Sequence, residues 1–289
     1  MKNAKLFYNS KPLTCEEQIA LLQERGILVK DSQAAIQHLS SVGFYRLFSY
    51  VKPLLAISSH PVDFDQAWDL YVFDRKIRLL LIDAIERIEV AFRVAISERM
   101  SIQYGSLWYN DPNQFSNLKR HADFIQEVAK LIKRKKHPLI KHYYETYSAP
   151  SLSPSWMLIE CLTFGNCSKV FCNLKNRKDK KSIAEHFGQT FKTLGSWIVS
   201  LTELRNICAH HERVWNHVFH YPPKNAPSAP HQKEKFYQQS YIVIKLLQQI
   251  SPHSDWQKKL KTLFEEHPKT PFYQMGFSEN WQNDGFWKI

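Results

Sequence analysis

The pattern of hydrophobic and polar positions along this chain is most regular between Phe64 and about Gln103. Apolar side chains recur there at spacings of three and four residues, which places them on one face of an α-helix. That face comprises Ile77, Leu81, Ala84, Ile85, Ile88, Phe92, Ala95 and Ile96. A helix of this kind buries its apolar face, so the pattern predicts one long helix packed against other helices.

A stripe of charged residues follows the same stretch. At about 100° per residue it contains Arg75, Arg78, Glu86, Glu89 and Arg93. Mixed charges on a helix commonly pair with one another in solvent. The alternative interpretation is that one or more of them orients a functional residue on another helix.

Two short helices are predicted ahead of the long one. Thr14 and Glu17 have the spacing of a capping box, so a helix should begin there and end near Gly26. A second should run from about Ser32 to Ser41. The pair resembles a helix-turn-helix, but its second helix has no Arg or Lys to reach base edges, so we favour an accessory region over DNA reading.

The remaining pattern is also helical. A basic helix over 118–147 is broken at Pro138, and an apolar helix over 156–162 is closed by a turn at Phe164, Gly165 and Asn166. Further helices are expected up to about Leu174 and over 190–211, 233–250 and 255–267, with a loop at 221–231 and an aromatic tail that packs back.

Glycine content supports an all-α fold. The chain has only 8 glycines in 289 residues, and long stretches lack both Gly and Pro, which argues against a β-sandwich or barrel. We expect an N-terminal helical accessory region over 1–61, a helical core over 62–250, and a C-terminal helix with an aromatic tail over 251–289.

Net charge points to a polyanionic partner. The chain carries a formal charge of +12 at pH 7, so nucleic acid is the first partner to consider. Two basic clusters are candidates for RNA phosphate contacts, with a solvated helix face or helix cap as the alternative. They are Lys133, Arg134, Lys135 and Lys136 in the first and Lys175, Arg177 and Lys178 in the second.

Nothing in the sequence indicates a membrane segment or a disulfide framework. No run approaches the roughly 20 apolar residues of a membrane-spanning helix, and residues 1–10 are too polar for a secretory signal. The 5 cysteines are odd in number and lack CxxC pairs. We therefore expect a cytoplasmic protein with no membrane contact and no metal.

The candidate chemistry lies in LTELRNICAHHERVWN, residues 201–216. Leu194, Trp197, Leu201, Leu204 and Cys208 predict the buried seam of its helix. On the helical wheel Glu203, Asn206 and His210 share another face, whereas Arg205 lies about 100° from Asn206. Arg205 and His210 therefore do not line up in an ideal helix, and we expect the helix to end within this run or the pair to act across an interface.

These side chains suit RNA cleavage without a metal. Histidine can move a proton near neutral pH, and arginine binds phosphate oxygens while staying charged. His210 could take the proton of a ribose 2′-hydroxyl or give one to the departing 5′-oxygen. Arg205 would stabilise the pentacoordinate phosphate.

At this point the sequence resembles known families. The run RNICAH (205–210) is similar to the Arg-x4-6-His signature of the HEPN ribonuclease superfamily. Phe73-Asp74-Arg75 with IRLLLIDAIERIEVAFR, then PSWMLIECLTFG, RNICAHHERVWN and MGFSENW resemble, in order, the Abi family of abortive-infection proteins in its AbiD/AbiF-like branch. Four blocks in the same order are far more specific than an isolated RxxxxH.

The resemblance implies an all-α, HEPN-like helical bundle with an N-terminal extension and a C-terminal packing tail. It implies a metal-independent endoribonuclease without cofactors that acts in anti-phage defence, and a homodimer whose facing motifs share one cleft. Arg205, Asn206 and His210 would be the catalytic set, with RNA as substrate and a bound non-coding RNA as a further partner. Helical spacing, rather than the resemblance, makes Glu86, Glu89, Arg93, Glu203 and His211 candidates for supporting residues. Because an RxxxxxH run also fits the signature, His211 is the alternative catalytic histidine.

Three alternatives compete with this interpretation. His210, His211, His217 and His220 are close enough in sequence to suggest zinc, although their spacing matches no common catalytic zinc pattern. A protein that keeps the fold could bind or regulate RNA without cleaving it. A nucleotide-binding role lacks support, because the chain has no Gly-rich phosphate loop.

Overall fold

The computed structural model describes residues 11–134, 136–230 and 234–288, and within them the fold is all-α apart from two short strands. The chain divides into two compact units. The first contains the described residues up to Lys76 together with Phe264–Thr270, and the second contains Ile77–Leu263 and the residues from Pro271 onward. No helix in the described ranges is long and apolar enough to cross a bilayer.

The first unit begins with the two predicted short helices. Helix α1 spans Cys15–Glu24 and α2 spans Ser32–Val42, and the capping box between Thr14 and Glu17 is present. Asp31 caps α2 by accepting hydrogen bonds from the next helical amides. Both helices are therefore confirmed close to their predicted ends.

The first unit also holds the two strands, which the hydrophobic pattern did not predict. Strand β1 (Ile27–Leu28) pairs in parallel with β2 (Val62–Asp63), and α3 (Phe44–Ile57) lies between them in the chain. Each strand has two residues, which is too short for alternation to show in a sequence. Helix α4 follows β2 directly.

Helix α4 is a single helix over Phe64–Tyr104, with 41 residues. From Ile77 to Ile96 the predicted apolar face is buried, with Ala95 alone half-exposed. Phe92 shows what this face packs against, because its ring contacts those of Phe164, Phe171 and Phe187. The longest predicted helix is thus confirmed, and its apolar face belongs to the core of the second unit.

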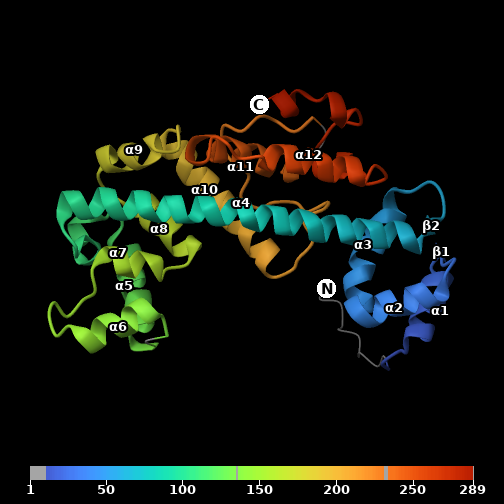
Figure 1. The fold of residues 1–289 in the computed structure, drawn as a ribbon, viewed down its shortest axis with the longest axis horizontal. Helices are drawn as coiled ribbons and strands as arrows, with labels where there is room; N and C mark the ends of the chain where they lie inside the picture. The colour runs from blue at the N-terminus through green and yellow to red at the C-terminus, as the bar shows by residue number, and fades with distance from the viewer. Residues whose placement is uncertain (1–10, 135, 231–233, 289) are drawn as a thin grey trace, which may run out of the picture. The chain divides into compact units, whose positions relative to one another are not determined.

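After α4 the second unit continues with two 3-10 helices, Trp108–Asn110 and Pro112–Gln114, and then with α5 to α10 (Figure 1). These α-helices are α5 (Leu118–Arg134), α6 (Pro138–Thr146), α7 (Ser155–Glu160), α8 (Phe164–Asn173), α9 (Arg177–Glu185) and α10 (Phe191–Ala209). The predicted break at Pro138 is confirmed, since this residue begins α6 with His137 as its cap.

Two local predictions in this region are wrong. The expected turn at Phe164, Gly165 and Asn166 is the first turn of α8, because Thr163 caps the helix there. The second basic cluster, Lys175, Arg177 and Lys178, also does not cap the C-terminal end of a helix. Asn176 accepts a hydrogen bond from Lys178 N, and the cluster begins α9.

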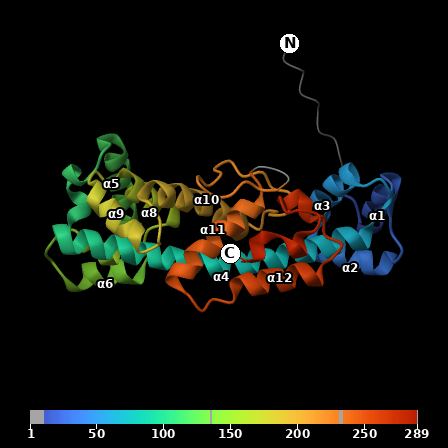
Figure 2. The same cartoon turned by 90° about the horizontal axis from the view of Figure 1, so that it is seen from above.

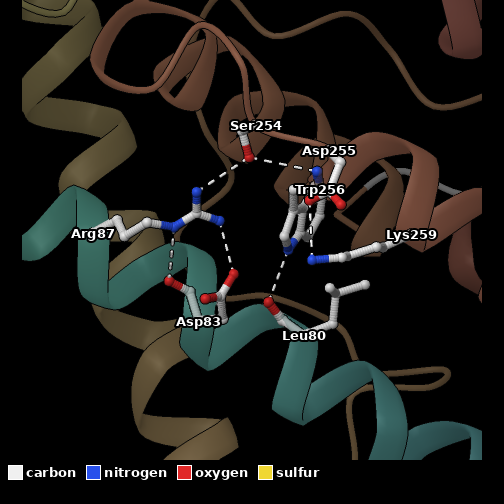
Figure 3. Close-up of polar contacts among 7 residues, drawn as sticks. All are labelled: Leu80, Asp83, Arg87, Ser254, Asp255, Trp256 and Lys259. Carbon is white, nitrogen blue, oxygen red and sulfur yellow. Dashed lines mark hydrogen bonds and ion pairs between the residues drawn. The ribbon is translucent and has the colours of Figure 1, made fainter.

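The second unit also contains α11 (Phe236–Ile250) and, up to Leu263, α12 (Trp256–Glu266), and both helices lie beside α4 (Figures 1 and 2). The indole of Trp256 donates to Leu80 O at 2.7 Å, and Arg87 donates to Ser254 Oγ at 3.2 Å (Figure 3). These contacts join the start of α12 to α4. Asp83 holds Arg87 in place at 2.7 Å.

The C-terminal tail packs on α11, as predicted. It forms three short 3-10 helices over Phe272–Met275, Trp281–Asn283 and Gly285–Lys288. Phe277 is fully buried, with its ring centroid 5.0 Å from that of Tyr237. Gly276 permits this approach, since a Cβ there would lie 3.1 Å from the Cβ atoms of three neighbouring residues.

Candidate functional site

Helix α10 carries the candidate motif at its C-terminal end. Thr190 caps its start, and the predicted seam of Leu194, Trp197, Leu201, Leu204 and Cys208 is buried throughout. Inside the core, Ser200 and Gln239 exchange hydrogen bonds and fix α10 against α11. Burial of this seam turns the motif's polar side chains away from the core.

The helix ends within the motif. His211 N donates to Cys208 O at 3.2 Å and Glu212 N donates to Ile207 O at 2.9 Å, which together form a Schellman motif. His211 occupies its left-handed position with φ of 59°, where glycine is the usual residue. Arg205 and Asn206 thus lie in the last turn, and His210 is the residue that ends the helix.

Arg205 is held from the long helix. Its Nε lies 3.9 Å from Oε2 of Glu89, a carboxylate that is 8% exposed. Glu89 also pairs with Arg93, which in turn donates to Leu162 O at 2.7 Å. Of the charged stripe predicted on α4, Glu89 therefore contacts the motif directly, and Arg93 reaches it only through Glu89. Arg78 also contacts the motif, since its Nη1 donates to Glu212 O at 3.4 Å.

Asn206 lies beside Arg205 at the surface. Its Oδ1 accepts a long hydrogen bond of 3.5 Å from Arg205 Nη1. His210 and His211 are both exposed. Arg205 has 39% of its side chain exposed, so a guanidinium, a carboxamide and two imidazoles are all open to an incoming ligand.

Glu86 does not join this group. It is exposed on α4, and it forms no hydrogen bond or ion pair with any residue that the structure describes. Of the stripe predicted from spacing, Glu89 thus contacts α10, whereas Glu86 does not.

Glu203 contacts the loop that follows the helix. Its Oε1 accepts from His220 N at 3.0 Å and lies 2.8 Å from His220 Nδ1, and its Oε2 accepts from Tyr221 N at 3.0 Å. Burial acts to raise the pKa of Glu203, but these hydrogen bonds outweigh it and the pKa is lowered. Glu203 is therefore a carboxylate that holds the loop to α10.

His217 lies next to this carboxylate. Its Nε2 is 3.9 Å from Glu203 Oε1, which is too far for a hydrogen bond, and burial lowers its pKa. The ligand atoms of Glu203, His217 and His220 lie within 4.8 Å of one another. The sequence suggested four histidines as possible zinc ligands. Among the described residues only His217 and His220 belong to this group, and His210 and His211 lie outside it.

A cavity of about 940 Å³ opens beside these residues. Helices α5, α8 and α10 form its walls together with the loop after α10, and Glu203, Asn206, His217 and His220 line it. Arg205 and His210 are not part of its lining. Asn206 is thus shared between the cavity and the Arg205 surface.

The basic clusters lie at opposite ends of α5. Lys133, Arg134 and Lys136 are exposed at its C-terminal end, and Lys135 lies outside the described residues. Lys175, Arg177 and Lys178 are exposed near its start, where Lys175 N donates to Gln114 O. A helix of this length separates them by about 25 Å, so they are two distinct surfaces.

The fold and site define an all-helical protein with an Arg-x4-His run at the end of a buried helix. The chain belongs to the family described as Abi-like protein, whose model matches residues 37–216. The match reaches from α2 to the end of the motif and suggests a role in abortive infection. No curated protein and no solved structure matched the chain.

Proposed function

We propose that this protein is a HEPN-type endoribonuclease that acts as an abortive-infection effector and cleaves RNA by attack of the ribose 2′-hydroxyl. The observation that carries the proposal is the end of α10. Arg205 is held there by the buried carboxylate of Glu89, and His210 follows on the exposed residue that closes the helix.

The reaction needs only groups of this kind. The 2′-oxygen bonds to phosphorus and the bond to the 5′-oxygen breaks, which leaves a 2′,3′-cyclic phosphate and a 5′-hydroxyl. His210 takes the 2′ proton or protonates the leaving oxygen, and Arg205 binds the charge that develops on phosphate. Asn206 positions Arg205 through its carboxamide oxygen. A second copy of the chain supplies the other proton-transfer group.

The test is cleavage of single-stranded RNA in EDTA. The wild type should produce 2′,3′-cyclic phosphate ends and leave DNA intact, because DNA lacks the attacking hydroxyl. His210→Ala should lower the rate by at least about 100-fold, and Arg205→Ala by a similar factor. His253→Ala, at another exposed histidine, is the matched control. His211→Ala separates the two neighbouring histidines, and we expect it to keep most of the activity.

Either of two results would refute the proposal: cleavage that EDTA abolishes in a protein that remains folded, or cleavage by the His210→Ala and Arg205→Ala variants at the wild-type rate. The exposed basic surfaces at both ends of α5 favour a second candidate, a protein that binds or regulates RNA without cutting it. Salt-dependent RNA binding with no cleaved product would support that function.

A further inference from the structure

We infer that Glu203, His217 and His220 form a binding site for a divalent transition-metal ion such as Zn²⁺. One carboxylate and two imidazoles are a ligand set that zinc uses when it keeps a fourth position open. This departs from the expectation, drawn from the sequence, that the chain holds no metal. The inference does not depend on RNA cleavage.

The spacing of the ligand atoms fits one ion. Two ligands at about 2.1 Å from a tetrahedral ion lie about 3.4 Å from each other. Oε1 of Glu203 is 2.8 Å from His220 Nδ1 and 3.9 Å from His217 Nε2, so the observed separations bracket that value. All three ligand atoms fall within 4.8 Å. Rotamer changes at the imidazoles would bring the three atoms to that spacing, because each already lies within 4.8 Å of the other two.

His217 supplies an independent observation. Its Nε2 is buried and has no hydrogen-bond partner among the residues that the structure describes. Buried polar atoms in folded proteins are nearly always satisfied, so an orphaned imidazole nitrogen beside a carboxylate calls for a ligand. A metal ion would satisfy this atom and leave the hydrogen bonds from the loop amides to Glu203 in place.

The surroundings hold the ligands in position. Glu203 lies on the rigid helix α10 with 12% of its side chain exposed. The loop that carries the histidines is anchored on both sides of His217, since Lys235 donates to Asn216 Oδ1 at 2.7 Å and Phe219 N donates to Glu234 O at 2.9 Å. The three residues line the cavity of about 940 Å³, so a further ligand could reach an ion bound to them from that space. An ion here would tie the loop to α10.

The test measures zinc on the metal-free full-length protein in the absence of RNA. After incubation with Zn²⁺ and gel filtration, the wild type should retain one zinc per chain more than His220→Ala. His220 is 79% exposed on its side chain, so this variant should fold normally. Zinc should also raise the Tm of the wild type by at least about 3 °C and leave that of His220→Ala unchanged. His210→Ala, which changes a histidine outside the set, should retain zinc as the wild type does.

Co²⁺ provides a second readout that surface binding would not reproduce. Bound to the wild type it should give the intense visible bands of a four- or five-coordinate ion, and Glu203→Gln and His217→Ala should lose them. Equal zinc retention by wild type and His220→Ala would overturn the inference, as would a Co²⁺ spectrum that resembles the hydrated ion. Because neither measurement involves cleavage, failure of this site and failure of the proposed ribonuclease would be seen separately.

Discussion

Glu89 Oε2 lies 3.9 Å from Arg205 Nε, and this pair joins α4 to the last turn of α10. Glu89 is 8% exposed and also pairs with Arg93, so its carboxylate is fixed from two sides. A buried carboxylate held in this way limits where the guanidinium can lie. The pair makes Glu89 a positioning residue whose influence on Arg205 can be measured.

Replacing this carboxylate should weaken cleavage. Glu89→Gln keeps the shape of the side chain but removes the charge that holds Arg205, and we expect the rate to fall about 10-fold, equivalent to about 1.4 kcal/mol in the transition state. Glu86→Gln is the matched control, because Glu86 lies exposed on the same helix and has no hydrogen bond or ion pair with a described residue. Single-turnover rates on one RNA would measure both. Equal rates for the two variants would contradict the positioning role.

The first basic cluster should contribute to RNA affinity. Lys133→Gln combined with Lys136→Gln removes two exposed cations, and each phosphate contact to a single strand contributes about 0.7 to the log–log salt slope. The slope should therefore fall by about 1.4. Lys258→Gln with Lys269→Gln removes the same charge elsewhere and should leave the slope unchanged. If both pairs behave alike, the cluster at the end of α5 is only a solvated face.

The left-handed residue at the end of α10 should affect stability. At His211, with φ of 59°, Gly is unstrained and a β-branched residue is strongly disfavoured. His211→Gly should therefore be more stable to urea than His211→Val by about 1–2 kcal/mol. Comparing the two variants cancels the contacts that the histidine side chain itself makes.

The same pair of substitutions at His253 provides the control. His253 is exposed and is not among the residues with positive φ. Glycine at this position makes the unfolded chain more flexible and relieves no strain in the folded state. His253→Gly should therefore be no more stable to urea than His253→Val. A larger preference for Gly at His253 than at His211 would show that the helix end carries no strain.

The C-terminal tail should depend on one glycine. A Cβ at Gly276 would lie 3.1 Å from those of Ala229, Lys235 and Tyr237, and its φ of 92° disfavours any side chain. Gly276→Ala should lower the free energy of unfolding by about 1–3 kcal/mol. Gly285→Ala, where a Cβ meets nothing within 4 Å, should change it by less than about 0.5 kcal/mol. Urea denaturation monitored by tryptophan fluorescence would decide between them.

The helices were predictable where local chemistry sets their ends. The capping box at Thr14 and the periodic face of α4 each depend on residues close in sequence, and both were located from the sequence. Gly165 shows the limit. A glycine between Phe and Asn resembles a turn, but its missing side chain allows close packing of α8 on α10, with Thr202 Cγ2 at 3.3 Å from where a Cβ would lie. The requirement for a glycine at this position arises from tertiary packing, which the neighbouring sequence does not reveal.

The site was predictable to a similar depth. The charged stripe on α4 suggested a residue that orients Arg205, and spacing could not distinguish Glu89, which contacts it, from Glu86, which does not. The helical wheel placed Glu203 on the face of Asn206 and His210. It could not show that Glu203 binds His220, because that partner comes from a loop beyond the end of the helix.

The way α10 ends has one more consequence. Arg205 lies on a helix that is buried along one side, and the backbone of His210 is still tied to that helix, because its N–H donates to Asn206 O at 2.9 Å. The helix therefore sets the distance between the two Cα atoms, and side-chain torsions set the distance between the guanidinium and the imidazole. The two groups can change their alignment by changing rotamer, without any repacking of the core.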